Sequence, residues 1–377
     1  MAELLTNTTD LTKVAAAIRE KGGTTDPLVY PDGFVTAIQA IQTGIAPQLI
    51  VTVSAGATVT ATNGSKTISG TSGSTGVCTL TVPEIGTWSV SATLDGKTSD
   101  TKAVTITDSY AVSLNFVYPT LNKNTWETIK DISVAGQGAN YWSVGDRKAV
   151  TLNGTVGHLT LSNYTTYAFI IGFNHNASLE GENCIHFQLA KTALSGGTDV
   201  CFCDSYYTSP VSTTGYFSMN SSATNSGGWA SSQMRTNICG TSLSSYSGTI
   251  IAVIPAALRA VLKSVTKYTD NTGNNSTSAS AVTATKDYFF LLSEFEVFGS
   301  ISRANSNEAS KQAQYAYYSA GNSKVKYKHN GTSAAARWWL RSPLASSSDG
   351  FENVNTNGTV EDRTARASFG FAPGFCV

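Results

Sequence analysis

The C-terminal stretch WWLRSPLASSSDGFENVNTNGTVEDRTARASFGFAPGFCV (338–377) alternates large apolar residues with short polar runs. Apolar anchors that recur every few residues can hold a backbone against a core while the side chains between them face outward. Small polar side chains on such a backbone lose little conformational entropy when they bind a ligand. We therefore predict that the apolar residues form a buried framework and that the polar side chains between them form a ligand-binding surface. The apolar anchors are Trp338, Trp339, Leu340, Phe351, Val354, Phe369, Phe371 and Phe375.

The predicted binding surface consists of small and polar side chains between these anchors. We expect one exposed patch that tolerates substitution, because surface residues away from special features contribute little to stability. The double change Ser346→Tyr with Arg363→Asp is expected to leave folding intact, whereas Trp338, Trp339 and Phe375 are expected in the core. The predicted patch consists of Leu344, Ala345, Ser346, Ser347, Ser348, Asn353, Asn355, Thr356, Asp362, Arg363, Thr364, Arg366 and Ser368.

Residues 111–377 are predicted to form one large domain that contains this stretch. The region mixes strand-like segments with long polar loops, and no break is visible after NTWETIKDIS (124–133). DYFFLLSEFEVFG (287–299) indicates a buried strand or strand pair. Pro255 is placed to open a helix whose apolar face is Leu258, Val261, Leu262 and Val265.

Residues 47–110 are predicted to form a small β-sandwich of immunoglobulin-like type. Apolar residues recur with period two, as at Trp88, Val90 and Ala92, and Asp95-Gly96 is a hairpin turn signal. Several short strands within about 60 residues are typical of such a sandwich. The segment TGIAPQ (43–48) is a plausible linker before it. We expect this domain to be a spacer.

Residues 1–43 are predicted to form two short amphipathic helices. The first follows the N-cap residues Thr9 and Asp10, carries Leu11, Val14 and Ile18 on one face, and stops at Gly22-Gly23. The second follows YPDG (30–33) and carries Phe34, Ile38 and Ile41 on one face. Two such helices bury too little apolar surface to fold alone, so we expect them to pack on copies of themselves or on another structural protein. A frayed tail is the alternative.

The composition of the 377-residue chain excludes several partner classes. Charged residues make up 13% and the formal net charge is zero, with no basic patch, so no nucleic-acid partner is expected. No apolar run of membrane-spanning length is present, so no membrane partner is expected. The first residues lack the pattern of a signal peptide. A weakly charged, extracellular type of surface without an export signal is consistent with release by host lysis as part of a virion.

The six cysteines fit neither a dense disulfide scaffold nor paired zinc knuckles. We expect buried free thiols, and the alternative is a disulfide among Cys184, Cys201, Cys203 and Cys239. Cys201 and Cys203 in CFCD (201–204) could bind a soft metal, but alternate residues of a strand point to opposite faces. We therefore expect no metal site there.

No catalytic constellation is visible in the sequence. The four histidines form neither HExxH nor a close pair, and His175 and His186 are expected to be structural. A phosphate-binding glycine loop and a G-x-S-x-G motif are both absent. We expect no catalytic activity, no cofactor and no metal.

Several motifs resemble a large family of phage tail proteins. They are NTWETIKDISVAGQGANYWSVGDRKAVTLNG (124–154), YAFIIGFNHN (167–176), GGWASSQMR (227–235), DYFFLLSEFEVFG (287–299) and ARWWLRSP (336–343). The N-terminal LTKVAAAIREKGGTTDPLVYPDGFVTAIQAI (11–41) is similar to the first segment of many tail-tip proteins of phages from Gram-positive gut bacteria. The resemblance implies a C-type-lectin-like domain of the formylglycine-generating-enzyme type over residues 111–377. The predicted fold class is therefore mainly β with α+β character.

Residues of about 337–377 are similar to the variable region of proteins diversified by retroelements, of which the major tropism determinant is the type. In that family AAY codons become NNY, which cannot encode Glu, Lys, Gln, Met or Trp. Between 340 and 377 only Glu352 and Glu361 belong to the excluded set. An ordinary polar loop would pass this test as well. The implied framework is Trp338, Trp339, Leu340, Arg341, Pro343, Phe351, Val354, Gly358, Gly370, Pro373 and Phe375.

The resemblance implies a phage tail-tip receptor-binding protein without enzymatic activity. Its partners would be a host surface receptor (protein or glycan) and other tail or baseplate proteins, and it would be a homotrimer in the virion. The active-site cysteine pair of formylglycine-generating enzymes has no counterpart here, and the loop tripeptides of calcium-dependent lectins are absent. A bacterial surface adhesin, or an enzyme of the formylglycine-generating type, is the alternative.

Overall fold

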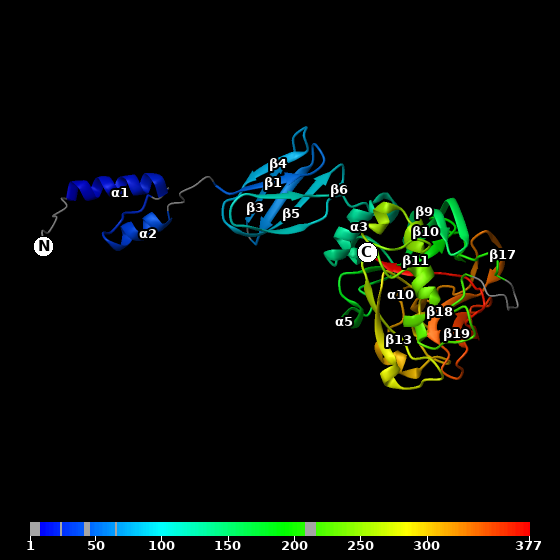
Figure 1. The fold of residues 1–377 in the computed structure, drawn as a ribbon. Coiled ribbons are helices and arrows are strands. Elements are labelled where there is room, and N and C mark those ends of the chain that lie inside the picture. The colour runs from blue at the N-terminus through cyan, green and yellow to red at the C-terminus, as the bar shows by residue number, and fades with distance from the viewer. Residues whose placement is uncertain (1–7, 23–24, 41–45, 65, 208–215) are drawn as a thin grey trace. The chain divides into compact units, whose positions relative to one another are not determined.

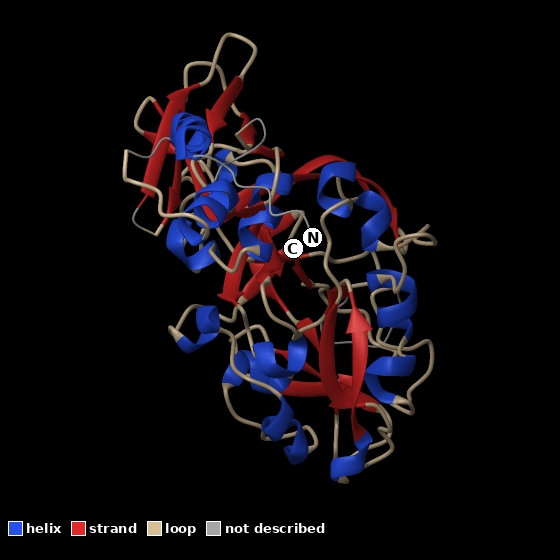
Figure 2. Cartoon of the chain, turned by 90° about the vertical axis from the view of Figure 1, so that its left-hand side faces the viewer, coloured by secondary structure: helices blue, strands red, loops and turns tan. Residues whose placement is uncertain are grey.

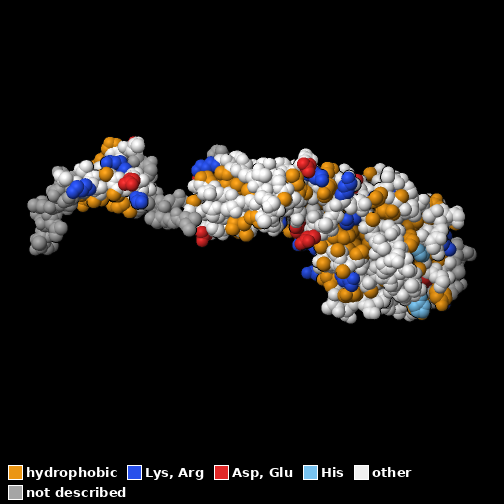
Figure 3. All heavy atoms as spheres, turned by 90° about the horizontal axis from the view of Figure 1, so that it is seen from above, with side chains coloured by type: hydrophobic (Ala, Val, Ile, Leu, Met, Phe, Trp, Pro, Cys, Tyr) orange, Lys and Arg blue, Asp and Glu red, His pale blue; other side chains and the backbone are white. Residues whose placement is uncertain are grey.

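The computed structural model describes residues 8–22, 25–40, 46–64, 66–207 and 216–377. The chain divides into two compact units, Met1–Phe116 and Val117–Val377 (Figure 1). The architecture is mainly β, with several sheets and short helices between them (Figure 2). This agrees with the fold class expected from the sequence. On the face drawn in Figure 3, charged side chains are sparse, as the composition requires.

Two helices, α1 (Thr8–Gly22) and α2 (Asp32–Ala40), pack on each other through Ala15, Ile18 and Phe34. Thr9 lies inside the first turn of α1 and not ahead of it as predicted. Val14 and Ile38, predicted on the apolar faces, are 48% and 53% exposed. Ile41 lies outside the described residues. The helix pair thus leaves part of its apolar surface uncovered, as the apolar side chains on these helices in Figure 3 show.

The following segment forms two sheets over one core, which is the arrangement of a β-sandwich. One sheet has the order β4-β1-β8, and the other has β3-β2-β5-β6 with β7 also paired to β5. Trp88, Val90 and Ala92 point into the core, as their period predicted. Asp95 and Gly96 both have positive φ in a two-residue hairpin turn. Strand β8 pairs with β1, so the sheet extends beyond residue 110, the predicted end of this domain.

The strands of the first unit are β1 (Gln48–Thr52), β2 (Thr58–Asn63), β3 (Lys66–Thr71), β4 (Val77–Thr81), β5 (Gly86–Leu94), β6 (Lys97–Thr98), β7 (Lys102–Ile106) and β8 (Tyr110–Ser113).

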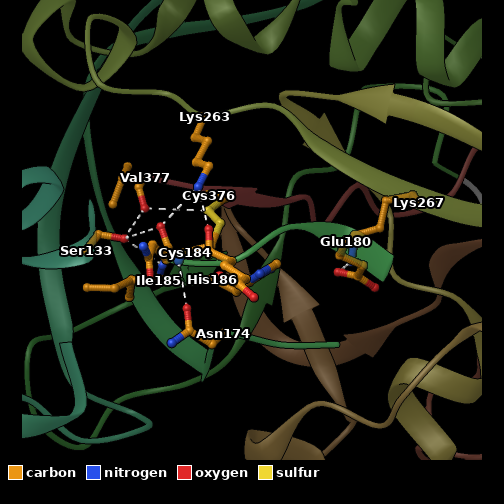
Figure 4. The surroundings of a disulfide bond; sticks show 12 residues. Ser133, Asn174, Glu180, Cys184, Ile185, His186, Lys263, Lys267, Cys376 and Val377 are labelled. Atoms are coloured by element: carbon orange, nitrogen blue, oxygen red, sulfur yellow. Dashed lines mark hydrogen bonds and ion pairs between the residues drawn. A yellow bond between two sulfur atoms is a disulfide. The ribbon is translucent and has the colours of Figure 1, made fainter. Parts of the chain in front are cut away.

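The second unit is built around a sheet of order β15-β21-β11-β10-β9. The C-terminal strand β21 (Gly374–Cys376) lies between β11 (Ile185–Lys191) and β15 (Phe289–Phe290), so the end of the chain forms part of the central sheet (Figure 1). Phe375 is fully buried, as predicted. A disulfide joins Cys376 to Cys184, whose Cα atoms are 6.0 Å apart (Figure 4).

The remaining strands of this unit are β9 (Arg147–Val156), β10 (Leu159–Phe173), β12 (Val200–Cys201), β13 (Val265–Asp270), β14 (Val282–Asp287), β16 (Lys326–Lys328), β17 (Gly331–Ala336), β18 (Trp338–Pro343), β19 (Gly350–Val354) and β20 (Val360–Thr364). Its α-helices are α3 (Trp126–Val134), α4 (Gly138–Tyr141), α5 (Ala177–Glu180), α6 (Gly228–Ser231), α7 (Ile250–Val253), α8 (Ala256–Arg259), α9 (Glu294–Phe298) and α10 (Ala316–Ser319). Three 3-10 helices are η1 (Leu121–Lys123), η3 (Ala279–Ala281) and η4 (Ser306–Lys311), and η2 (Met234–Cys239) is a π-helix.

Two sequence predictions about this unit need correction. In 287–299 the strand residues are Asp287, which ends β14, and Phe289 and Phe290 of β15. A helix follows, because Ser293 and Glu296 form a capping box and Gly299 ends the helix with positive φ. The helix predicted after Pro255 has a single turn, α8, and Val265 begins strand β13. Leu258 and Val265, which have this apolar spacing, are both buried although they belong to two different elements, since Leu258 lies in α8 and Val265 in β13.

The cysteine prediction holds for four residues, since Cys78, Cys201, Cys203 and Cys239 are buried thiols. The pairing of Cys184 with Cys376 was not anticipated. Cys201 and Cys203 do not point to opposite faces of a strand as predicted, because β12 ends at Cys201. The sulfur atoms of Cys201 and Cys203 lie 3.9 Å apart. The hydrogen bond with Cys201, together with burial, raises the pKa of the Cys203 thiol well above its usual value.

Within the described ranges, no helix combines the length and apolar character needed to cross a bilayer.

Candidate ligand-binding site

The candidate site is built on a three-stranded antiparallel sheet of order β18-β19-β20. All residues of β18 and β19 are buried. Trp339 is fully buried, and its indole N–H donates to the carbonyl oxygen of Phe217 over 2.9 Å. The Trp338 indole donates likewise to the carbonyl oxygen of Lys324. The framework predicted from the sequence is therefore a real core at Trp338, Trp339, Leu340, Arg341, Pro343, Phe351, Val354, Gly370, Pro373 and Phe375, whereas Gly358 is half-buried.

The connection from β18 to β19, residues 344–349, is named the display loop here. Its backbone is held by Asn225, which is fully buried. The Asn225 side-chain amide donates to the carbonyl oxygens of Leu344, Ser347 and Gly350 over 3.2, 2.8 and 2.9 Å. The Asn225 backbone N–H donates to Ser348. The path of the loop is thus set by its carbonyl groups, which leaves the side chains free to vary.

The structure divides the predicted patch by exposure. Ser346, Ser348 and Arg366 are exposed, as predicted. Three residues were wrongly predicted as exposed, because Leu344 and Ser368 are 6% and 3% exposed and Asn353 is fully buried. Half-buried residues of the patch are Ala345, Ser347, Asn355, Thr356, Asp362, Arg363 and Thr364.

Each buried exception has a physical reason. Asn353 lies on the central strand of its sheet and donates to the carbonyl oxygen of Glu361 over 3.1 Å. The hydroxyl of Ser368 donates to the carboxylate of Asp204 over 2.7 Å. A polar residue in a polar stretch is buried where another part of the chain offers it a partner.

The patch extends along the whole β19–β20 hairpin. In the β19–β20 hairpin, Gly350 pairs with Thr364 at the end where the display loop lies, and Val354 pairs with Val360 at the other end, next to Asn355 and Thr356. Four residue steps separate these ends by about 13 Å.

The two faces of β20 differ as well. Asp362 forms an ion pair with Arg303, whereas Arg363 bonds Glu361 over 2.8 Å and Glu361 also pairs with Arg337. Alternation along the strand therefore points Asp362 and Arg363 to opposite faces.

A hollow of about 640 Å³ lies beside the display loop. Its wall includes Leu344, Ala345 and Ser346 of the display loop and Val360 of β20. The rest of the wall comes from Thr277 and from the segment Ser302–Ala304, which is distant in sequence. Its size is within the range of small-molecule sites. This groove and the exposed side chains of the display loop form the candidate binding site.

The wall segment Ser302–Ala304 is fixed from beneath by Glu294, the first residue of α9. The Glu294 carboxylate accepts from the backbone N–H and hydroxyl of Ser302 over 2.7 and 2.6 Å, and from the N–H groups of Arg303 and Ala304 over 3.2 and 3.0 Å. Four donors on one buried carboxylate make a rigid wall. The groove is therefore preformed, which lowers the entropic cost of binding.

Glu352 lies beneath the same wall and is fully buried on β19. Burial raises the pKa of Glu352 well above its usual range, and the neighbouring carboxylate of Glu294 adds to this shift. Both carboxyl oxygens of Glu352 are buried beneath the groove, and neither has a hydrogen-bond partner among the described residues.

Sequence reasoning did not find the groove residues Thr277, Ser302, Arg303 and Ala304 or the anchor Asn225. They come from polar loops whose composition does not differ from other polar loops of the chain. One usable signal was the S-x-x-E capping box at Ser293, which predicts a helix start and places Glu294 in its first turn. The contacts across the chain carried no sequence signal.

Arg341 belongs to a buried ion cluster behind the sheet. Its guanidinium forms a bidentate pair with Glu296, and Nε donates to Thr269 over 2.7 Å. Lys267 Nζ contacts Glu180, Glu296 and the Tyr315 hydroxyl over 2.5, 2.9 and 2.8 Å. Paired charges of both signs make this a structural cluster in the core.

Among the described residues, two groups of three have metal-ligand spacing. In the group of His175, Glu180 and Glu296, Lys267 already supplies the positive charge. In the group of Cys184, His186 and Cys376, the two sulfur atoms are joined in the disulfide (Figure 4). Burial lowers the pKa of His186 well below its usual value, and Nδ1 lies 3.1 Å from the Tyr315 hydroxyl. Both groups are explained as structural elements.

Comparison with known families matches the part of the chain that carries this site. Residues 211–377 match a domain of unknown function, DUF6273. The match includes the π-helix, the groove wall, the display loop and the C-terminal strand. No curated protein matches the chain.

Proposed function

We propose that this protein is a phage tail-tip receptor-binding protein that presents a variable ligand-binding surface on a C-type-lectin-like domain. It would be made in the host cytoplasm and would act in the virion. Its ligand would be a host bacterial surface receptor, and its other partners would be tail or baseplate proteins. The function is binding and not catalysis.

The observation that carries the proposal is the separation of framework from display. The exposed side chains of Ser346 and Ser348 stand on a loop whose backbone is held by Asn225, between two strands that are buried throughout. Substitution at such positions changes the surface without removing core contacts. A protein that must recognise changing receptors needs this arrangement.

The location of Glu352 and Glu361 supports diversification of the segment. These are the two residues between 340 and 377 that NNY codons cannot encode. Glu352 is fully buried, and Glu361 is held by Arg337 and Arg363. Both residues are held in place by the fold. This is expected for residues that diversification does not change.

The N-terminal helices support assembly of several copies. Val14, Val35 and Ile38 are about half exposed, at 48%, 51% and 53%. Exposed apolar side chains on a small helical pair are an unfavourable surface unless another chain covers them. We propose that equivalent helices of two further copies cover them in a homotrimer. Several weak sites on one particle would then act together, which raises avidity by about 10² to 10⁴.

The test is competition for adsorption of the phage that encodes this chain. Purified protein added to host cells should block adsorption of the phage. The variant Ser346→Tyr with Ser348→Tyr should fold but fail to block. The control Thr87→Tyr with Ser89→Tyr places the same side chains on the exposed face of strand β5 in the sandwich and should block as well as the wild type.

The outcome that refutes the proposal is equal blocking by the display-loop variant and the control, or no blocking by the wild type. A genomic observation tests diversification separately. A reverse-transcriptase gene beside the coding sequence, with a near-repeat of the 3′ end that differs at adenines, is expected.

A further inference from the structure

A second hollow, of about 540 Å³, lies in the larger unit away from the groove. The two share no lining residue. Among the described residues, the lining of the second hollow has three aromatic rings, two side-chain amides and one serine hydroxyl, and no Lys, Arg, Asp or Glu. Its lining is Gly157, His158, Tyr206, Tyr216, Ser221, Gln233, Asn237, Ile238 and Gly248.

The aromatic part of this hollow is partly open to solvent. Tyr206 and Tyr216 are 39% and 43% exposed, although large aromatic side chains are usually buried. The imidazole of His158 stacks on the ring of Tyr216, with interplanar angle 21°, and the Tyr206 ring lies 6.1 Å from that of Tyr216. Stacking on His158 fixes the ring of Tyr216. A fixed ring offers contact area at a low entropic cost.

Asp204 holds both tyrosines in place. Its buried carboxylate accepts from the backbone N–H groups of Tyr206 and Tyr216 over 3.0 and 2.8 Å. It also accepts from the N–H of Phe217 and the hydroxyl of Ser368 over 3.1 and 2.7 Å. The Asp204 carboxylate thus fixes the backbone at Tyr206 and at Tyr216. This is the construction expected of a preorganised site.

The polar side of the hollow is formed by a π-helix, η2, and the residue before it. Gln233 and Asn237 present exposed side-chain amides there, and Gln233 Nε2 donates to the Ser221 hydroxyl over 3.1 Å. A π-helix is rare and occurs frequently at functional sites.

Gly157 lets the two sides approach. It has φ +55, and a Cβ there would lie 3.0 Å from both Ile238 and Tyr216. Any side chain at this position would separate the aromatic side from the π-helix.

We propose that this hollow binds a neutral saccharide. The C–H groups of a sugar ring carry slight positive charge and pack on the negative face of an aromatic ring. Amide side chains both donate and accept, so Gln233 and Asn237 can pair with neighbouring sugar hydroxyls, which do the same. An uncharged lining selects against acidic and basic ligands, since these would be desolvated without a counter-charge. The site does not depend on the proposed function of the display loop.

The test uses the full chain and a panel of free neutral sugars by saturation-transfer NMR: the methyl glycosides of glucose, galactose and mannose, with N-acetylglucosamine and rhamnose. A monosaccharide has few heavy atoms, so its dissociation constant is expected in about the millimolar range. At least one sugar should bind. The variant Tyr206→Ala with Asn237→Ala should weaken that binding by about tenfold or more. The variant Thr87→Tyr with Ser89→Tyr, on the exposed face of strand β5 in the sandwich, is the control and should bind as the wild type does.

Folding of each variant is checked by its melting temperature, because both substituted residues are exposed and their loss should not unfold the protein. A second variant, Gln233→Ala, tests the amides with the aromatic pair intact and should also weaken binding. The proposal is overturned if no neutral sugar of the panel binds, if only charged sugars or peptides bind, or if Ser346→Tyr removes sugar binding while the pocket variants keep it.

Discussion

The backbone N–H of Asn225 donates a hydrogen bond to the carbonyl oxygen of Ser348 over 2.8 Å, although the two residues lie far apart in the chain. The side chain of Ser348 is exposed, so one residue is fixed by its backbone and free at its side chain. This relationship explains how a loop can keep its path while its surface changes. The shape of the display loop is determined by a residue outside it.

Asn225→Ala is expected to destabilise the protein by about 1–3 kcal/mol, because it leaves the carbonyl groups of Leu344, Ser347 and Gly350 without their side-chain donor. Chemical denaturation measures this loss, and amide hydrogen exchange should rise in residues 344–350. The control Asn237→Ala removes an exposed amide and should change stability by less than about 0.5 kcal/mol. Equal stability of Asn225→Ala and wild type would show that the anchor contributes nothing.

Trp339→Ala is expected to cost about 3–5 kcal/mol, because it empties a fully buried site and removes one of the two hydrogen bonds that the Phe217 carbonyl accepts. The ring of Phe369 lies 4.8 Å from that of Trp339 and would lose its partner as well. Trp339→Phe keeps part of the volume and should cost less. An unchanged melting temperature for Trp339→Ala would contradict the framework assignment.

The pH dependence of stability should reveal the buried Glu352. Its raised pKa means that the folded protein binds the proton more tightly than the unfolded chain does, so stability falls as pH rises above the usual value of 4.5. Burial also raises the pKa of Glu308 to about 7, which adds to the fall between pH 4.5 and 7. Glu352→Gln replaces the titrating carboxyl by an amide of similar size and should flatten this dependence. A variant with the same slope as the wild type would show that Glu352 does not titrate in this way.

The display positions should separate into tolerant and intolerant residues. Ser346→Tyr with Ser348→Tyr is expected to change the free energy of unfolding by at most about 0.5 kcal/mol. Ser368→Tyr should destabilise much more, because Ser368 is buried and bonds Asp204. Arg363→Asp, expected from the sequence to be harmless, should destabilise because it faces Glu361. Denaturation curves of the variants decide the matter, and a tolerated Ser368→Tyr would place that residue on the surface.

Assembly should depend on the N-terminal helices. Light scattering of the full chain at micromolar concentration should give the mass of a trimer. Val14→Glu with Ile38→Glu should give a monomer, because it places charges on the surface proposed to be covered. The control Lys13→Glu changes charge on the same helix at a polar position and should remain trimeric. A monomeric wild type would refute the proposed trimer.

Much of the fold could be predicted from local patterns. The period-two run at Trp88 predicted sandwich strands, the Asp95-Gly96 pair predicted a hairpin turn, and the apolar anchors from Trp338 to Phe375 predicted a core. The errors came where a short apolar run allowed two structures. The apolar run predicts strand where the structure has helix α9, although the capping box at Ser293 and Glu296 is a local signal that favours helix.

The binding site was predicted only in part. Exposure of Ser346 and Ser348 followed from their place between anchors, but the burial of Asn353 and Ser368 did not. A polar side chain in a polar stretch is buried or exposed according to whether a distant residue bonds it. For Ser368 that residue is Asp204, and the sequence gives no sign of the pairing.

The sequence by itself determined that the apolar anchors such as Trp338, Trp339 and Phe375 are buried and that the segment between them is polar, because large apolar side chains at such a spacing are driven out of water. Tertiary structure alone decided where the surface lies. It brought Asn225 to the display loop, set Ser302–Ala304 beside that loop in the wall of one groove, and joined Asp204 to Tyr206, Tyr216 and Ser368. The hydrophobic effect is non-directional and can be read from a pattern, whereas each of these hydrogen bonds depends on the position of two groups that only the folded chain brings together.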